Sequence, residues 1–298
     1  MNNLQIESSI KGIYLDVNYR PVEAPKALVV ILHGMSEHKE RYNYFLEELA
    51  KENYLPVIYD HRGHGKSLKN PKDLGYFYSD DADSLSEDTK IVINYFKEKY
   101  PDIPIILFAH SMGTLIARNY LSKYDDEITK LILCGPPTKN NLVDVGLSLA
   151  KIANSFGNPR KVNKFLDKLT FSSFNKKYNN PNEWLSKNEE NVKAYNNDPL
   201  CGFIFTTNGF LNLYTLQKNV FQKNRYLVKN KSLPILLIAG SDDPVIINTK
   251  KFQELERFLQ DLGYNNTTSK TYKDLRHELL QEDNRDLIIQ DILEFIRK

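Results

Sequence analysis

One segment constrains the fold of this chain more than any other. From Ile105 an apolar run, IILFAH, stops at Ser111, and a helical pattern, MGTLIARNY, begins directly after it. We interpret the segment as a strand, a sharp turn and a helix, with Ser111 at the apex. Ala109 and Gly113 stand two positions away on either side, and both are small. Such a turn exposes the serine hydroxyl above a sheet, and the start of the helix offers N–H groups to a developing negative charge.

The same alternation of strand and helix runs through the first 135 residues. Strand-length apolar runs such as ALVVIL and LPVIY are separated by helical patterns. This order is typical of β-α-β units and predicts a parallel sheet in an α/β fold. One helix is expected from about Ser84 to Lys99, because Ser84 and Glu87 fit a capping box and Pro101 follows the end.

A long stretch in the middle of the chain interrupts this pattern. Residues 137–231 are rich in Asn, Lys and aromatic residues and show no strand alternation, and the α/β pattern then resumes with LPILLIAG. We therefore predict an α/β core of residues 1–136 and 232–298, with a mostly parallel sheet covered by helices on both faces. Residues 137–231 are predicted to form an inserted, mainly helical cap.

The composition limits the classes of protein to consider. A chain of 298 residues with 41% hydrophobic residues and a net charge of +2 is globular and has no strong field for nucleic acid. The longest apolar runs are far shorter than the roughly 18–20 residues that span a bilayer. The N-terminal MNNLQIESSIKG does not fit a secretory signal, so we expect a cytoplasmic protein. Cys134 and Cys201 are isolated, and we expect no disulfide, metal or cofactor.

A serine hydroxyl becomes a nucleophile only beside a base that a third group orients. On a parallel sheet the acid and the base follow later strands at the same edge. Of six histidines only His277 follows Ser111, and it stands just past the last expected strand. The preceding strand leads into Ser-Asp-Asp-Pro, so either Asp242 or Asp243 could orient the base. We prefer Asp243, because Pro244 fixes the turn beyond it.

Each of these elements also has an ordinary interpretation. A serine before a helix is commonly an N-cap, an exposed histidine is commonly solvated, and Asp-Asp-Pro is commonly only a turn. Their order along the chain, each directly after its strand, favours a catalytic triad. An oxyanion hole would then use the backbone N–H groups of Met35, after an early strand, and Met112. We expect His33 to hold loop hydrogen bonds.

Five segments carry a family resemblance. They are HGMSEHKERY at 33–42, DHRGHGKS at 60–67, AHSMG at 109–113, GSDDPV at 240–245 and RHELL at 276–280. Together they resemble the monoacylglycerol lipase and lysophospholipase group of the α/β-hydrolases over nearly the whole core.

The resemblance implies the α/β-hydrolase fold and a role for each matched residue. It maps the nucleophile to Ser111, the acid to Asp243, the base to His277 and the oxyanion donors to Met35 and Met112. Two positions depart from the family pattern, because Ala109 replaces a glycine and Thr114 a small residue. Neither change removes a catalytic group.

The inserted segment opens with an amphipathic pattern. Apolar residues recur at helical spacing in NLVDVGLSLAKIANSFGN. Such a helix either packs its apolar face on the core or forms a lid that lines an acyl tunnel or touches a membrane surface. Aromatic residues in 198–210 could line the same pocket. The candidate substrate-binding residues are Leu142, Val145, Leu149, Phe203 and Phe205.

The predicted function is hydrolysis of a carboxylic ester of a single-chain lipid, a monoacylglycerol or a lysophospholipid, through an acyl-enzyme. The same triad could serve a small-ester esterase or a peptidase, because nucleophile chemistry does not fix the acyl group. A different class of protein is also possible, a ligand-binding relative with negligible turnover. The sequence indicates neither chain-length preference nor oligomeric state.

Overall fold

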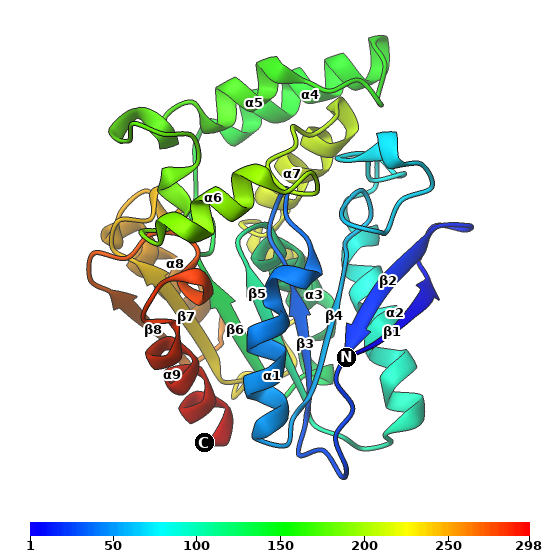
Figure 1. The fold of residues 1–298 in the computed structure, drawn as a ribbon, viewed down its shortest axis with the longest axis vertical. Coiled ribbons are helices and arrows are strands. Elements are labelled where there is room, and N and C mark those ends of the chain that lie inside the picture. The colour runs from blue at the N-terminus through cyan, green and yellow to red at the C-terminus, as the bar shows by residue number, and fades with distance from the viewer.

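The computed structural model describes residues 1–298 and is centred on one eight-stranded sheet (Figure 1). The strands are β1 (Asn2–Glu7), β2 (Tyr14–Tyr19), β3 (Leu28–Leu32), β4 (Leu55–Tyr59), β5 (Ile105–His110), β6 (Lys130–Cys134), β7 (Ile235–Gly240) and β8 (Thr267–Tyr272). Their order in the sheet is β1-β2-β4-β3-β5-β6-β7-β8. Strands β3 to β8 run parallel, whereas β2 pairs antiparallel with both β1 and β4. The predicted mostly parallel sheet is confirmed.

Helices cover both faces of this sheet. Those outside the insertion are α1 (Asn43–Lys51), α2 (Ser84–Lys99), α3 (Met112–Tyr124), α8 (Thr249–Leu262) and α9 (Arg285–Arg297). Successive strand residues point to opposite faces. In β3, Leu28, Val30 and Leu32 therefore join a core with α2, α3 and α8, while Val29 and Ile31 join a second core with α1 and α9. Because both faces are buried, the strands read as continuous apolar runs in the sequence.

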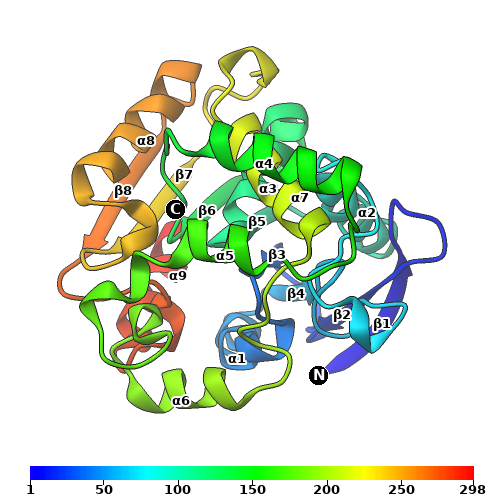
Figure 2. The same ribbon diagram turned by 90° about the horizontal axis from the view of Figure 1, so that it is seen from above.

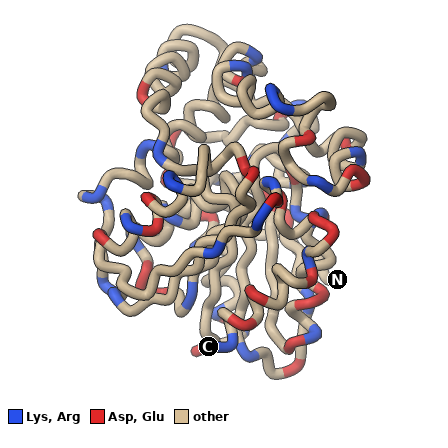
Figure 3. Tube along the Cα trace, turned by 90° about the vertical axis from the view of Figure 1, so that its left-hand side faces the viewer, with Lys and Arg blue, Asp and Glu red and all other residues tan.

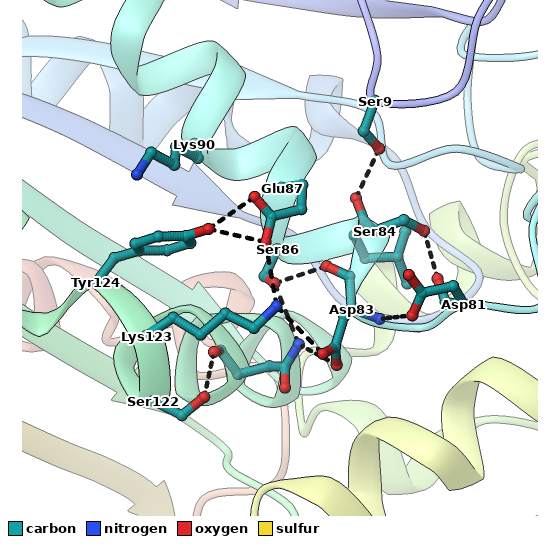
Figure 4. Close-up of polar contacts among 12 residues, drawn as sticks. Ser9, Asp81, Asp83, Ser84, Ser86, Glu87, Lys90, Ser122, Lys123 and Tyr124 are labelled. Carbon is teal, nitrogen blue, oxygen red and sulfur yellow. Dashed lines mark hydrogen bonds and ion pairs between the residues drawn. The ribbon is translucent and has the colours of Figure 1, made fainter. Parts of the chain in front are cut away.

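The start of α2 differs from its sequence prediction. The helix has the expected bounds, but Glu87 does not turn back to form a capping box, and no side chain caps its N-terminus. Glu87 instead accepts hydrogen bonds from Tyr124 (2.9 and 3.0 Å) and Lys123 (3.1 Å) of α3, as Figure 4 shows. Ser84 accepts a hydrogen bond from Arg62 (2.7 Å). The capping-box prediction was wrong because tertiary partners compete successfully for both side chains.

The insertion between β6 and β7 is mainly helical, as predicted. It holds α4 (Val143–Phe156), α5 (Lys164–Phe171), α6 (Glu189–Asn197) and α7 (Thr207–Asn219). Its one β contact is an isolated bridge between Val162 and Thr206. These helices lie above the end of the sheet at which the strands β3 and β5 to β7 finish (Figures 1 and 2). The exact boundaries of core and cap stay a prediction.

Helix α4 presents its apolar stripe outward. The residues that it buries are Gly146, Leu147 and Ala150. A Cβ on Gly146 would lie 2.7 Å from the Tyr214 ring, so glycine permits the close approach of α4 to α7. Four large apolar residues in or beside α4 are more than half exposed: Leu142 61%, Val145 53%, Ile152 59% and Phe156 88%. The interpretation that this stripe packs on the core was therefore wrong for these four residues, whereas Leu149 of the same stripe does pack on the core.

The surface and the helices carry two further general features. Basic and acidic residues are interspersed in Figure 3, which fits the small net charge of +2. None of the helices combines the length and the hydropathy that crossing a bilayer requires.

Candidate active site

Ser111 sits at a strained turn between β5 and α3. Its backbone has φ +50° and ψ −120°, a region that residues with a Cβ rarely adopt, and it is held by a hydrogen bond from its N–H to the Cys134 carbonyl (2.9 Å). Helix α3 crosses the end of β3 closely, because a Cβ on Gly113 would lie 2.4 Å from the Leu32 carbonyl oxygen. Ala109 is fully buried in the strand, and the structure accommodates its methyl group.

His277 and Asp243 form a buried pair beside this turn. Asp243 follows β7, His277 follows β8, and each side chain is no more than 2% exposed. His277 Nδ1 lies 2.9 Å from Asp243 Oδ2, and the other carboxylate oxygen accepts the Val245 N–H (2.8 Å). The carboxylate therefore holds the imidazole with Nδ1 as the donor, which leaves Nε2 to act as a base.

The alternative acid, Asp242, lines the same cavity as Asp243 but does not hydrogen-bond to His277. It is exposed, and its carboxylate accepts a hydrogen bond from Ser241 rather than from His277.

Gly135 explains how the pair of His277 and Asp243 fits against β6. With φ +57° and a Cβ that would lie 2.9 Å from His277 Nδ1, position 135 has room only for glycine.

The surroundings of His277 favour its protonated form. Burial disfavours the imidazolium, but the Asp243 carboxylate and its hydrogen bond outweigh burial and raise the pKa of His277 above its ordinary value. The carboxylates of Glu278 and Glu37 act in the same direction. The His277 imidazole therefore binds a proton more readily than a free histidine does.

A buried ion network connects the loop after β3 to the loop of His277. Arg41 Nη1 donates to Glu37 (2.7 Å), and the guanidinium makes a two-point contact with Glu278 (2.6 and 2.7 Å). Glu37 also accepts hydrogen bonds from the Gly34 N–H (2.5 Å) and from the Tyr42 hydroxyl (2.9 Å). Burial raises the pKa of Glu278, but Arg41 outweighs it and lowers that pKa to about 2.

Sequence reasoning missed the role of this network. Glu37, Arg41 and Glu278 stand within HGMSEHKERY and RHELL, but in those two motifs only His33, Met35 and His277 had a predicted role. The spacing of four between Glu37 and Arg41 suggests a pair on one helical face, but Glu37 stands before the 3-10 turn Lys39–Tyr42, so the ion pair does not arise from a helix. The contact of Arg41 with Glu278 spans 237 positions, and no local pattern reports it.

The predicted oxyanion donors lie on two sides of Ser111. Met112 is the first residue of α3, so its N–H has no partner within the helix. Met35 follows Gly34, and a Cβ on Gly34 would lie 3.1 Å from the Ser111 Cβ, so this loop passes directly over the serine. His33 holds the loop, as predicted: its Nδ1 contacts the Gly34 carbonyl (2.8 Å), and its Nε2 accepts the His61 N–H (3.0 Å).

One cavity of about 1050 Å³ includes Ser111, Asp243, His277, Met35 and Met112 among its lining residues. This volume is at the upper end of the range for small-molecule sites. Apolar side chains of the insertion form much of the remaining wall: Leu142, Leu169, Phe171, Phe174, Trp184, Phe203, Ile204 and Leu213.

The predicted substrate residues divide into two groups. Leu142 and Phe203 line the cavity. Val145 does not, because it lies on the exposed stripe of α4, and Leu149 packs against the main core. Phe205 is fully buried against Phe77, Phe210 and His64, so it belongs to the core and not to the pocket.

One group of side chains has the composition of a metal site. The ligand atoms of His38, Asp198 and Cys201 lie within 4.8 Å of one another. His38 Nε2 and Asp198 already contact each other at 2.9 Å, and burial raises the pKa of the Cys201 thiol. A thiol that stays protonated is a poor metal ligand, so we interpret the group as a structural contact between the loop after β3 and the insertion.

Comparisons with known proteins agree with this site. The chain is 26% identical over 281 residues to the monoacylglycerol lipase of Mycolicibacterium smegmatis, which covers 93% of this chain and 90% of that protein. It is 28% identical over 234 residues to the monoglyceride lipase of Rattus norvegicus, 78% of this chain and 70% of that protein. Its fold is similar to that of a thermostable carboxyl esterase from Bacillus coagulans (TM-score 0.92, 24% identity, 99% and 97% coverage).

The comparison at family level covers most of the chain. The sequence pattern of the family described as serine aminopeptidase, S33, matches residues 23–284. The chain therefore belongs to this family and has the α/β-hydrolase fold, and it is similar to proteins named monoacylglycerol lipase and monoglyceride lipase.

Proposed function

We propose that this chain hydrolyses carboxylic esters of single-chain lipids, with Ser111 as nucleophile, His277 as base and Asp243 as the orienting acid. The observation that carries the proposal is one cavity that contains all three residues and continues along apolar side chains of the insertion. Relatives named monoacylglycerol lipase and monoglyceride lipase support the same substrate class.

The proposed reaction has two halves. In the first, Ser111 Oγ attacks the ester carbonyl while His277 Nε2 takes the hydroxyl proton, and the N–H groups of Met35 and Met112 stabilise the oxyanion. The C–O bond to the alcohol then breaks, and His277 gives its proton to the departing alcohol. In the second half, water attacks the acyl-serine with His277 again as base, and Ser111 leaves with the proton as the fatty acid is released.

The outward stripe of α4 supports a further part of the proposal. Helix α4, to which most of these exposed apolar residues belong, lies at the end of the molecule opposite the C-terminus (Figure 1). Phe165 of α5 is 65% exposed near the same surface. An apolar stripe of this size fits transient contact with a lipid surface, from which a single-chain substrate could enter the cavity.

The test is ester hydrolysis by the wild type and by Ser111→Ala. The panel contains p-nitrophenyl esters of two to sixteen carbons, a monoacylglycerol and lysophosphatidylcholine. We expect activity that prefers medium or long chains and falls by about 10⁶ in the variant, as for other serine hydrolases in which the triad acts as a unit. Activity confined to the shortest esters would contradict a lipid substrate, and full activity of Ser111→Ala would contradict the mechanism.

A peptidase is the second candidate, because the matching family is described as serine aminopeptidase. An aminopeptidase needs a carboxylate that is free to hold the substrate ammonium group. Glu37 and Glu278 line the cavity, but Arg41 engages both of them. Asp167 and Asp242 also line it and have no cationic partner, so they are the candidates for that contact. Amino-acyl p-nitroanilides added to the same panel decide between the two candidates. A ligand-binding protein with negligible turnover would show no Ser111-dependent activity on any of these substrates.

A further inference from the structure

The insertion places an aromatic ring against the proposed base. Trp184 is the only tryptophan of the chain, and it stands in a short 3-10 turn, Glu183–Leu185, between α5 and α6. Its ring centroid lies 5.3 Å from that of His277, with an angle of 36° between the planes. Trp184 also lines the cavity, so the same ring contacts the imidazole and bounds the substrate space.

A second ring also contacts the His277 imidazole. His110, the last residue of β5, lies 4.6 Å from His277 between centroids, with an angle of 45° between the planes. Burial lowers the pKa of His110 well below its ordinary value, so this neighbour stays neutral. His277 therefore packs against a neutral imidazole and an indole, and the indole is the aromatic ring that attracts a cation most strongly.

The turn that carries Trp184 is tied to the loop of His277. Arg276 donates to the carbonyls of Glu183 (2.6 Å) and Ser186 (2.9 Å). The N–H of Glu278 donates to the Leu185 carbonyl (2.7 Å). The residues before and after His277 thus both bind the turn, so Trp184 is held in register with the imidazole.

From this geometry we infer that Trp184 is a positioning residue for His277: it holds the imidazole plane and stabilises the imidazolium that forms when Ser111 is deprotonated. The inference rests on the proposed function, which makes His277 the base. The contact between the two rings is independent of that proposal. The turn Glu183–Leu185 of the insertion then contributes to catalysis, whereas helix α4 of the same insertion faces outward.

Other groups around His277 also influence its proton affinity. They are Asp243 after β7, Glu278 on its own loop, Glu37 and Arg41 from the segment after β3, and His110 on β5. A test must therefore change the indole alone. Trp184→Phe keeps an aromatic ring with a weaker attraction for cations, and Trp184→Leu keeps only apolar bulk.

The first measurement uses the single tryptophan as a reporter. Indole fluorescence is followed from pH 5 to 9 in Ser111→Ala, which needs no activity, and in Ser111→Ala/His277→Gln. We expect a fluorescence titration with a midpoint above 6.5 in the first variant and its loss in the second, because an adjacent imidazolium quenches indole emission. The same titration in both variants would overturn the inference.

The second measurement is the pH profile of kcat for ester hydrolysis. We expect Trp184→Leu to move the acid limb to lower pH by about 0.5 to 1 unit and Trp184→Phe to move it less. Thermal unfolding of each variant shows whether it has folded. An acid limb that stays in place in a folded Trp184→Leu enzyme would overturn the inference, whereas activity that survives in Ser111→Ala would overturn the proposed function instead.

Discussion

The Arg41 network offers a prediction whose size follows from the structure. Arg41 is the only cation in contact with Glu37 and Glu278, and all three side chains are at most 10% exposed. In Arg41→Met both carboxylates stay buried and lose their cation, together with three hydrogen bonds of 2.6 to 2.7 Å. Breaking a buried ion pair from one side costs about 3–5 kcal/mol of unfolding free energy. We expect a loss of this size at pH 7.

The loss of stability in Arg41→Met also depends on pH, and the direction follows from the pKa values of the two carboxylates. In the wild type the pKa of Glu278 is lowered to about 2, so its stabilising contribution is complete above 4.5 and lost as the pH falls toward 2. In Arg41→Met the two carboxylates lack their cation, and burial raises their pKa values in the folded state. Such groups bind protons more readily in the folded state than in the unfolded state. The difference in unfolding free energy between wild type and Arg41→Met should therefore become smaller as the pH falls.

The assay is urea unfolding followed by circular dichroism at pH 8, 7 and 5.5. The surface variant Arg20→Met is the matched control, because Arg20 pairs with Glu47 at 3.1 Å with both side chains more than 40% exposed and should matter by less than about 1 kcal/mol. Replacing Glu37 and Glu278 by glutamine in the Arg41→Met background should restore more than half of the loss. A loss below about 1 kcal/mol, or an equal loss at every pH, would refute the reasoning.

Three further predictions concern the turn, the acid and a buried histidine. Gly113→Ala should lower stability by about 1–3 kcal/mol in thermal unfolding, because its Cβ would lie 2.4 Å from the Leu32 carbonyl; an unchanged Tm would contradict this. Asp243→Asn should lower kcat by about 10⁴ and move the acid limb of the pH profile down, because the carboxylate that raises the pKa of His277 is gone. Burial lowers the pKa of His64 to about 4, so wild-type stability should fall by about 3 kcal/mol from this residue as the pH drops from 6.5 to 4. His64→Phe should flatten that dependence in urea titrations, and an unaltered slope would count against it.

Much of the α/β core was predictable because short segments of the sequence indicate its strands, helices and turns. The apolar run and small residues around Ser111, and the strands before Asp243 and His277, placed these residues at one edge of the sheet. The antiparallel strands β1 and β2 were not predicted, because β1 buries only one of its six residues and carries mostly polar side chains.

The insertion was harder to predict because helical spacing does not say which face is buried. The stripe of α4 has a clear period, yet Gly146, Leu147 and Ala150 form the buried side, and Val145, Ile152 and Phe156 face outward. Phe205 was expected in the pocket and lies in the core. The contact of Trp184 with His277 joins positions 93 residues apart, so only the folded structure brings them together.

The central claim is that Ser111 is a nucleophile activated by His277. Its most direct test is labelling with a fluorophosphonate, which forms a covalent bond with an activated serine, followed by mass spectrometry of the digested protein. The account predicts one adduct on the peptide that contains Ser111, none in Ser111→Ala, and much slower labelling in His277→Gln. An adduct on another serine, or labelling that does not depend on His277, would contradict it.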